Sequence, residues 1–560
     1  MNKNKLYHPL LSFLVIVSIL LTSCSALAGL GMGKKITVSL AYGSEKEAWL
    51  TPLINDFNNS RQTTQEGSII QIEAQPIGSI EAVEQILSGK LQPTVWSPAS
   101  SLYFPVANDE WRENHSDDLV NDNCKDLVLS PVVIAMWRPM AEALGWPEKA
   151  IGWSDIASLA TSENGWADYG YPEWGSFKFG HTHPGYSNSG LVAIIAQAYS
   201  GAGKQRSLTG DDVNSDKVKD FMKDVQASII HYGTSTGFFA TRMFDRGPSY
   251  LSAAVMYENL VVNQESNRLS GASQQMSVVA IYPKEGTFWA NHPYAILNAP
   301  WVTSEQKEAA DIFEDYLLAK PQQNKAMQYG FRPADPSLAL SAPLDAQHGV
   351  DPQQPKTVLE IPKAQVIRDV RALWEQTKKP VDLVLAIDVS GSMSGQKITA
   401  ARNSLVQFIN LLGDNDRLQV VTFGSHVNTM IPMTEIGPQR TDIVRRVSGI
   451  IEGGDTTLYD AVLQSYQELS TQGNPKHIRA VVVLTDGNDT ASENTLDDVL
   501  AQIGSKSEEG GNSIKMFTIA YGSDADTDVL MKLAEKTGGL QYDSKPENIN
   551  QVYSDIATFF

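Results

Sequence analysis

VDLVLAIDVSGS, residues 381–392, is the stretch that decides the fold of the last third of this chain. Its first seven residues are mostly apolar, which predicts a buried strand of a parallel sheet. Because side chains two positions apart point the same way in extended backbone, Asp388, Ser390 and Ser392 can converge where the strand ends. Carboxylate and hydroxyl oxygens are hard ligands, which suit Mg²⁺, Mn²⁺ or Ca²⁺ better than Zn²⁺. The stretch therefore predicts a divalent-cation site at the end of a strand.

Two later stretches are expected at the same edge of this sheet. Residues 453–460, GGDTTLYD, place Thr456 and Thr457 at the start of a helix. Residues 481–487, VVVLTDG, read as another apolar strand that ends at Asp486. In an open α/β sheet, ligands bind beyond the carboxyl ends of the strands, so these groups are expected to face residues 388–392.

Residues 380–560 resemble the von Willebrand factor A domain, whose Asp-x-Ser-x-Ser motif is matched by Asp388, Ser390 and Ser392. Thr456 matches the family's threonine, and Asp486 matches its second aspartate. The resemblance implies a doubly wound, Rossmann-like fold with a metal-ion-dependent adhesion site at these five residues. Asp455 stands between the glycine pair and Thr456, where many members have threonine directly, so Thr457 stays open as the alternative ligand. We favour Thr456.

The resemblance also implies how this site works. In the family, hydroxyls bind the ion directly and the aspartates act largely through water, which leaves one coordination position for an outside ligand. It implies Mg²⁺, or Mn²⁺ or Ca²⁺, as the cofactor and an Asp or Glu carboxylate of a protein partner as the outside ligand. No nucleophile and base pair stands out, so the metal is expected to bind rather than catalyse, and the chain is predicted not to be an enzyme.

Composition limits the remaining possibilities. A chain of 560 residues is longer than one core usually supports, so two or three domains are expected. Hydrophobic residues make up 42%, which is enough for globular cores. With 44 Lys+Arg against 64 Asp+Glu, the net charge is −20, which predicts no nucleic-acid partner.

The first 24 residues read as a targeting segment. Lysines near the start precede an apolar run, residues 10–21, that is too short to span a bilayer comfortably. LTSC, residues 21–24, resembles the bacterial lipobox and implies a lipid-modified Cys24 that anchors the mature protein outside the cytoplasmic membrane. The alternative is an ordinary secretory signal cut near Ala26 or Ala28. Residues 25–35 read as a tether. If Cys24 carries lipid, the chain's 2 cysteines cannot form an intrachain disulfide.

Between residues 36 and 345, strands alternate with helices, which predicts a parallel-type sheet. Pro131, within an apolar run, predicts an edge strand or a crossing point. The region resembles a two-lobed extracellular solute-binding protein of the periplasmic-binding kind, nearest to the molybdate- and sulfate-type oxyanion binders. The stretches that carry this resemblance are LVLSPVVIAM at 127–136, GYSNSGL at 185–191 and AIYPKEGT at 280–287.

The resemblance implies an interlobe site for a small solute, an oxyanion or a sugar. Helix N-termini favour anions, so side chains at helix starts that follow strands are the candidates. They are Ser44, Ser97, Ser100, Ser187 and Ser189, together with Tyr257 after a strand-like run. Each serine is also explained as an ordinary helix cap. Residues 346–379 are predicted to be a linker that ends in a helix.

These observations favour a surface-anchored binding protein, with an adhesion domain that binds a protein partner. The solute-binding-like module would sense or present a ligand, or has been reused as an interaction scaffold. The alternative is the receptor of an importer for a small oxyanion or sugar. A third possibility is a helper of metal-insertion machines, which also contain von Willebrand modules. Export argues against it, because such machines work with cytoplasmic ATPases.

Overall fold

The computed structural model of the protein describes residues 34–121, 123–233, 235–504 and 514–560. The predicted targeting segment, with Cys24, and nearly all of the tether lie outside these ranges. Within them, no helix combines the length and the apolar character needed to cross a membrane.

The first lobe of the N-terminal module is built on a sheet with the order β2-β1-β3-β10-β4. Its strands are β1 (Lys35–Tyr42), β2 (Ile69–Pro76), β3 (Val95–Ser97), β4 (Lys125–Asp126) and β10 (Pro293–Ile296). Its helices are α2 (Glu47–Ser60), α3 (Ser79–Leu87), α4 (Phe104–Trp111), α12 (Ser304–Leu318) and α13 (Lys320–Gln328). β1 runs parallel to both β2 and β3, so the ends of these strands and the helices that follow lie at one edge.

The second lobe has the order β11-β5-β7-β6, with β8 and β9 also paired to β5. Its strands are β5 (Val128–Trp137), β6 (Phe179–Gly180), β7 (Ala253–Tyr257), β8 (Val278–Ile281), β9 (Trp289–Ala290) and β11 (Arg332–Pro333). Its helices are α5 (Arg138–Ala143), α6 (Trp153–Thr161), α7 (Asn188–Ala202), α8 (Gly210–Val213), α9 (Asp216–Gln226), α10 (Thr236–Arg246) and α11 (Glu258–Leu269).

Pro131 lies where β5 changes partners and not on an edge strand. β5 pairs with β11 through Val128 and Leu129, then with β9 through Ser130 and Pro131. From Val132 onward it pairs with β7. Proline cannot donate to a ladder, and a point where partners exchange tolerates that loss. Of the two predicted outcomes, the crossing point is therefore the one found.

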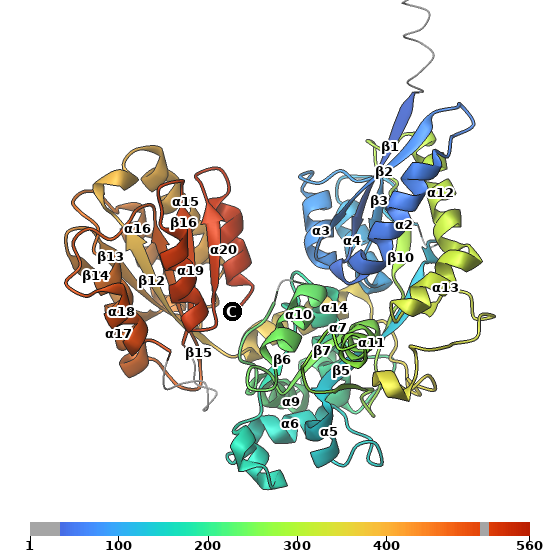
Figure 1. Ribbon diagram of the computed structural model, residues 1–560, viewed down its shortest axis with the longest axis horizontal. Coiled ribbons are helices and arrows are strands. Elements are labelled where there is room, and N and C mark those ends of the chain that lie inside the picture. The colour runs from blue at the N-terminus through green and yellow to red at the C-terminus, as the bar shows by residue number, and fades with distance from the viewer. Residues whose placement is uncertain (1–33, 122, 234, 505–513) are drawn as a thin grey trace, which may run out of the picture.

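The C-terminal domain is a sheet with the order β14-β13-β12-β15-β16-β17, in which only β14 is antiparallel to its neighbour (Figure 1). Its strands are β12 (Val381–Asp388), β13 (Arg417–Phe423), β14 (Val427–Glu435), β15 (Ile478–Thr485), β16 (Ile514–Tyr521) and β17 (Leu540–Ser544). Its helices are α15 (Gln396–Leu411), α16 (Ile436–Ser448), α17 (Leu458–Gln472), α18 (Leu496–Gln502), α19 (Thr527–Lys536) and α20 (Ile549–Ala557).

Helices cover both faces of this sheet, which is why β12 is buried along its whole length. Val384 and Ala386 pack in one cluster with residues of α17, α18 and α19. Leu383 and Leu385 pack in another cluster, with residues of α15, α16 and α20. The alternation of side chains along a strand explains this division, and the two layers of helices make the domain doubly wound.

A single helix, α14 (Ala364–Thr377), connects the domains and touches both lobes. Arg371 Nη1 donates a hydrogen bond of 2.9 Å to the Tyr103 hydroxyl, which belongs to the first lobe. The Trp374 ring packs edge-on against His183 and Tyr232 of the second lobe, with centroids 4.8 and 5.3 Å apart. α14 is therefore a bridge across the interlobe boundary.

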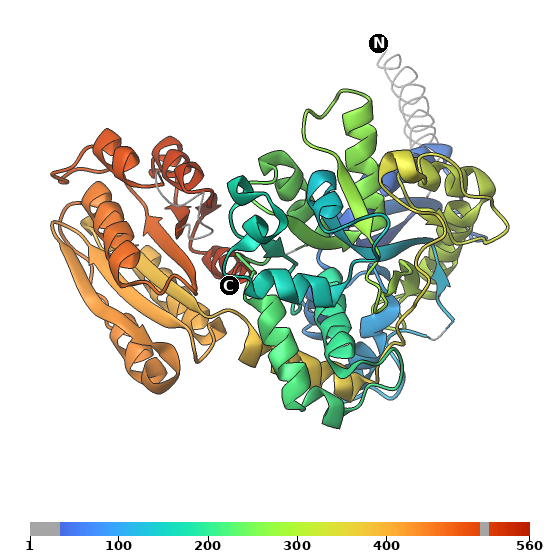
Figure 2. The same cartoon turned by 90° about the horizontal axis from the view of Figure 1, so that it is seen from below.

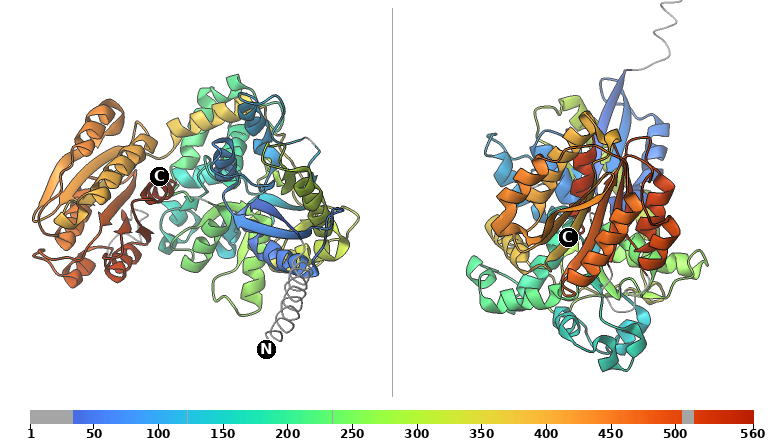
Figure 3. Two further views of the ribbon diagram at one scale, coloured as in Figure 1. Left: turned by 90° about the horizontal axis from the view of Figure 1, so that it is seen from above. Right: turned by 90° about the vertical axis from the view of Figure 1, so that its left-hand side faces the viewer.

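The C-terminal domain also docks directly on the second lobe. Tyr232 N donates to Phe559 O at 3.3 Å, and the Phe559 ring lies under the guanidinium of Arg242, 5.6 Å from its centroid. Figures 2 and 3 place the chain's C-terminal end between the orange-red domain and the green helices of the module. The two lobes and the C-terminal domain are therefore in direct contact.

Truncating the tryptophan at the bridge is expected to destabilise the N-terminal module. Trp374 is buried, so Trp374→Ala leaves a cavity and should lower the free energy of unfolding by about 3–5 kcal/mol. The exposed Gln365 of the same helix is the matched control, and Gln365→Ala should stay within about 0.5 kcal/mol. Urea unfolding followed by near-ultraviolet circular dichroism measures both. Equal midpoints for the two variants would show that α14 does not stabilise the lobes.

Candidate functional site

Asp388 ends β12 with its carboxylate buried and fixed by hydrogen bonds. Its Oδ1 accepts from Ser390 N at 2.8 Å, and its Oδ2 accepts from the hydroxyl of Thr485 at 2.6 Å. Thr485 is the last residue of β15, the neighbouring parallel strand. Two strand ends therefore orient this carboxylate.

A chain of hydroxyls leads from this strand end to the second aspartate. The hydroxyls of Ser390 and Ser392 lie 2.9 Å apart, and Ser392 Oγ donates to Asp486 Oδ1 at 2.7 Å. Asp486 directly follows β15 and is fully buried. Four residues predicted from separate stretches of sequence thus meet at one edge of the sheet.

The glycine loop that carries the predicted threonine lies against the first loop. Gly453 N donates to Val389 O at 2.6 Å, and Gly391 N donates to Gly454 O at 2.9 Å. Gly454 has a φ of +94°, and a Cβ there would stand 2.5 Å from the Ser425 hydroxyl oxygen. Glycine is required at this position because both the backbone conformation and the space exclude a side chain.

The two candidate threonines have different surroundings, although both are buried. Thr457 Oγ1 donates to Gly424 O at 3.0 Å, so its hydroxyl is committed to the backbone. Thr456 is held through its backbone, since its N–H donates to Thr490 Oγ1 at 3.0 Å. Among the described residues, no hydrogen bond of the Thr456 hydroxyl is found.

The two aspartates differ in their electrostatic surroundings. Burial raises the pKa of the Asp388 carboxyl, and the charge of nearby Asp486 raises it further, against the hydrogen bonds from Ser390 and Thr485. Asp486 has a cation beside it, because Lys397 Nζ lies 2.5 Å from its Oδ2. Sequence reasoning missed Lys397; the only signal was a lysine in the first turn of the helix that follows the motif. The site therefore holds two buried carboxylates and one ammonium.

This set of donors fits a hard divalent cation. All of its candidate ligand atoms are oxygens. Two of the candidate residues supply carboxylates, and the others supply hydroxyls. Across the described ranges, no cluster of three or more His, Cys, Asp or Glu side chains could hold a metal, so a site here depends on hydroxyl ligands. Mutual repulsion between Asp388 and Asp486 gives a cation a physical reason to bind.

The six residues predicted for the solute site lie at strand ends or helix starts, and all of them are buried. Ser44 Oγ of the first lobe donates to Ser235 Oγ of the second at 3.0 Å. Ser187 and Ser189 both lie within hydrogen-bond distance of the Thr236 hydroxyl, at 3.2 and 2.8 Å. These three predicted residues therefore meet at the start of α10.

The other three predicted residues have more varied roles. Ser100 caps the short helix Ser101–Tyr103, since its Oγ accepts from Leu102 N at 3.1 Å. The Tyr257 hydroxyl accepts from Asn188 Nδ2 at 3.2 Å. The Ser97 hydroxyl is buried and has no hydrogen-bond partner among the described residues.

A buried ionic cluster that the sequence did not predict lies between these groups. Lys46 Nζ donates to Glu45 Oε1 at 2.8 Å and to Pro98 O at 3.2 Å, and His292 Nδ1 lies 3.2 Å from the same Glu45 oxygen. Asn259 of the second lobe donates to Glu45 O at 3.4 Å. Charged groups of the protein itself therefore fill this part of the boundary between the lobes.

The protonation of this cluster follows from burial and pairing. Burial alone would raise the pKa of the Glu45 carboxyl, but the Lys46 ammonium and His292 outweigh it and lower that pKa to about 2. Burial, aided by the charge of Lys46, lowers the pKa of His292 to about 4. At neutral pH the imidazole of His292 is thus neutral. In the Glu45–Lys46 pair beside it, burial lowers the pKa of the Lys46 ammonium, and the charge of Glu45 opposes that shift.

Comparison with known proteins assigns both parts of the chain. Residues 38–332 match the family model of the bacterial extracellular solute-binding protein, and residues 382–555 match the von Willebrand factor type A domain. Both types of domain are typically binding modules without catalytic activity, and von Willebrand factor type A domains often bind a metal at a site of this kind. Solute-binding homologues are extracytoplasmic.

Two relatives show how the similarity is distributed. The inter-alpha-trypsin inhibitor heavy chain H4 of Bos taurus is 30% identical over 173 residues, which cover 29% of this chain. The match spans only 18% of the length of that relative. An uncharacterized protein of Mycobacterium tuberculosis is 23% identical over 481 residues, which cover 80% of this chain and 64% of the relative.

Among solved structures, a periplasmic thiamin binding protein is similar over 61% of this chain and 96% of its own, at 11% identity and a TM-score of 0.43. The fold is a periplasmic-binding-like module followed by a von Willebrand factor A domain, as the sequence predicted. Since the solute-binding model matches more than half of the 560 residues, the chain belongs to the bacterial extracellular solute-binding protein family, and it carries a von Willebrand factor type A domain at residues 382–555.

Proposed function

We propose that this protein is a surface-anchored binding protein whose C-terminal domain binds an acidic group of a protein partner through a divalent metal. The metal ligands would be Asp388, Ser390, Ser392, Thr456 and Asp486. The observation that carries the proposal is the hydrogen-bonded chain from Asp388 through both serines to Asp486, which gathers oxygen donors from two strand ends. Mg²⁺ is the expected ion, with Mn²⁺ or Ca²⁺ as substitutes.

Each residue has a defined part in this proposal. When bound, the ion supplies positive charge and a coordination position for a carboxylate of the partner. The serine and threonine hydroxyls hold it, and the aspartates orient them and supply negative charge. Thr456 is supported over Thr457 because the Thr457 hydroxyl already donates to Gly424 O. Lys397 neutralises Asp486, so the site is less anionic than its two carboxylates alone and can accept an anionic partner group.

We assign the solute-binding module the role of a scaffold that presents the adhesion domain. The buried Glu45–Lys46–His292 cluster supports this role, because an anionic solute would have to compete with Glu45 for the ammonium of Lys46. The alternative, an importer's receptor for a small oxyanion or a sugar, has less support in its oxyanion form for the same reason. Anchoring through a lipid at Cys24 remains our proposal for attachment to the outer face of the cytoplasmic membrane.

Replacing the first aspartate should abolish the response to metal. We expect saturating Mg²⁺ to stabilise the wild-type C-terminal domain by about 2.7 kcal/mol at a hundredfold excess over Kd, and not to stabilise Asp388→Ala. Thermal unfolding with Mg²⁺ and with chelator measures the effect. Asp455→Ala, in an exposed position of the neighbouring loop, is the control and should respond like wild type. An equal midpoint shift in Asp388→Ala would mean that the metal ligands are assigned wrongly.

Selection from a displayed library of random peptides tests the partner's chemistry without a known partner. In Mg²⁺, the wild type should enrich sequences with a fixed Asp or Glu, and chelator or Asp388→Ala should abolish this enrichment. Ile451 is 82% exposed beside the glycine loop, so an apolar residue is expected near the selected acid. Ile451→Ser should weaken selected peptides by about tenfold while preserving the Mg²⁺ response. Enrichment without any acidic position would refute the proposed mode of binding.

The buried ionic cluster predicts how stability changes when one or both of its charges are removed. Lys46→Met leaves the buried Glu45 carboxylate without its ammonium and should cost about 3–5 kcal/mol of unfolding free energy. The double variant Glu45→Gln/Lys46→Met should recover most of that loss, because no charge is left unpaired. Lys35→Met, on the exposed end of β1, is the control. Denaturant unfolding measures the free energy of unfolding of each variant. A double variant no more stable than Lys46→Met would show that Glu45 and Lys46 do not form the proposed ion pair.

The lipid anchor is tested by fractionation. Cys24→Ser should move the protein from the membrane fraction to the soluble extracytoplasmic fraction and abolish incorporation of a labelled fatty acid. Several acyl chains on one residue hold a protein firmly, whereas removing them leaves no comparable anchor. Membrane retention of Cys24→Ser would indicate another means of attachment.

A further inference from the structure

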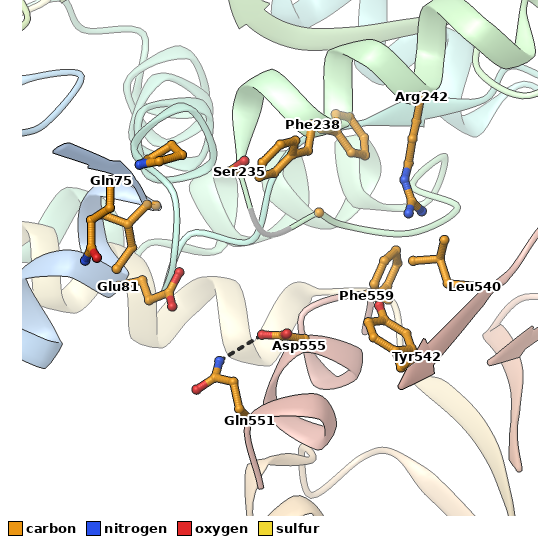
Figure 4. Close-up of a pocket in the computed structure, with 15 residues that line it drawn as sticks. Gln75, Glu81, Ser235, Phe238, Arg242, Leu540, Tyr542, Gln551, Asp555 and Phe559 are labelled. Atoms are coloured by element: carbon orange, nitrogen blue, oxygen red, sulfur yellow. Dashed lines mark hydrogen bonds between the residues drawn. The ribbon is translucent and has the colours of Figure 1, made fainter. Parts of the chain in front are cut away.

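A cavity of about 510 Å³ lies where the two lobes and the C-terminal domain meet (Figure 4). The first lobe contributes the end of β2 and the start of α3, and the second lobe contributes α10. The C-terminal domain contributes β17, α20 and Phe559. None of the metal-site residues and none of the six predicted solute residues line it. The cavity therefore exists only because the domain docks on the module.

Two carboxylates from different parts of the chain face this cavity. Among the described residues, the hydrogen-bond partners of Glu81 on α3 and Asp555 on α20 are amide groups. Gln85 Nε2 donates to Glu81 at 3.0 Å, and Gln551 Nε2 donates to Asp555 at 2.9 Å. The backbone of Gly78 also hydrogen-bonds Glu81. Burial raises the pKa of both carboxyls, and the charge of Asp555 adds to the rise at Glu81. Within the described residues, neither is part of an ion pair. The cavity thus has an acidic side without a cation.

The opposite side of the cavity carries a positive charge and aromatic rings. Arg242 of α10 lies over the ring of Phe559 and has no carboxylate within ion-pair distance in the described part of the chain. Phe238 is 56% exposed, although large apolar side chains are usually covered. Tyr542 adds a further ring. Figure 4 shows Glu81 and Asp555 on one side of the space and Arg242 with Phe559 and Tyr542 on the other.

We propose that this cavity binds a short zwitterion, an amino acid or a small peptide with an apolar side chain. Its ammonium group faces Glu81 and Asp555, its carboxylate faces Arg242, and its side chain packs on Phe238 and the other rings. A simple anion would meet the two carboxylates, and a simple cation would meet Arg242. Only a ligand with both charges and an apolar body matches all three surfaces. The volume lies within the usual range of about 300–1,000 Å³ for small-molecule sites.

Binding here would couple the solute module to the adhesion domain. A ligand held by Glu81, Arg242 and Asp555 contacts both lobes and the C-terminal domain at once. It binds only the docked arrangement and stabilises that arrangement by mass action. The proposal does not depend on the metal site, because none of its residues contributes to that site.

Calorimetry with a matched set of dipeptides tests the proposal. The chain from Ser25 onward is titrated with Phe-Ala, with N-acetyl-Phe-Ala, which lacks the ammonium, and with Phe-Ala amide, which lacks the carboxylate. We expect each blocked form to bind at least tenfold more weakly than Phe-Ala. No heat with Phe-Ala and with phenylalanine, or equal affinity for the blocked forms, would overturn the proposal. A higher affinity for phenylalanine than for Phe-Ala would identify amino acids as the class of ligand.

Variants assign each end of the ligand. Glu81→Gln and Asp555→Asn should each lower the affinity for Phe-Ala at least fivefold. In these two variants, N-acetylation of the dipeptide should cost less affinity than it does in the wild type. In Arg242→Gln, conversion of the dipeptide's carboxylate to an amide should cost less affinity than it does in the wild type. Asp528→Asn, an exposed acid on α19, is the control and should bind like wild type. Asp388→Ala should lose the Mg²⁺ response and keep the dipeptide affinity, which separates this site from the adhesion site. Wild-type affinity in all three cavity variants would refute the assignment.

Discussion

The placement of the Asp388 carboxylate at the buried end of β12 is the constraint on which the candidate site depends. β12 is apolar and covered on both faces, so polar groups can be concentrated only where it ends. A carboxylate removed from water must be satisfied, and hydrogen bonds from Ser390 and Thr485 do this. The loops carrying Ser392 and Gly453 then close over the same point. The sheet therefore sets the position of the site before any ligand is considered.

Buried charge is balanced in similar ways at two distant places in the chain. In the C-terminal domain, Lys397 compensates Asp486. In the interior of the N-terminal module, Lys46 compensates Glu45. Both ammonium groups are in short contact with a carboxylate, yet Lys46 is fully buried while Lys397 is partly exposed. Lys397 can thus exchange its contact with water at little cost, whereas Lys46 has no such alternative.

The elements that could be predicted from sequence are those whose pattern is local. β13, Arg417–Phe423, has such a pattern, because a buried run between two turns leaves little freedom in where the strand begins and ends. The serine and aspartate loops could be placed because parallel strands bring their carboxyl ends to one edge. The start of the first helix is less clear from its local pattern. A short helical turn covers Ser44–Lys46 and α2 begins at Glu47, which leaves the charged pair in the turn.

Contacts between distant segments could not be predicted in this way. His292 reaches Lys46 across 246 positions of sequence, and the acidic wall of the cavity joins Glu81 to Asp555 only through domain docking. The exchange of partners at Pro131 likewise depends on strands that come much later in the chain. A single sequence contains no local signal for such pairings, and their geometry appears only in the assembled fold.

The course of α14 has a mechanical consequence. It lies across both lobes through Arg371 and Trp374, and it leads directly into β12. Because α14 contacts both lobes, a rotation of one lobe against the other would move this helix. Movement of the helix would be passed to β12, which follows it in the chain. The helix therefore links the relative orientation of the two lobes to the position of the C-terminal domain.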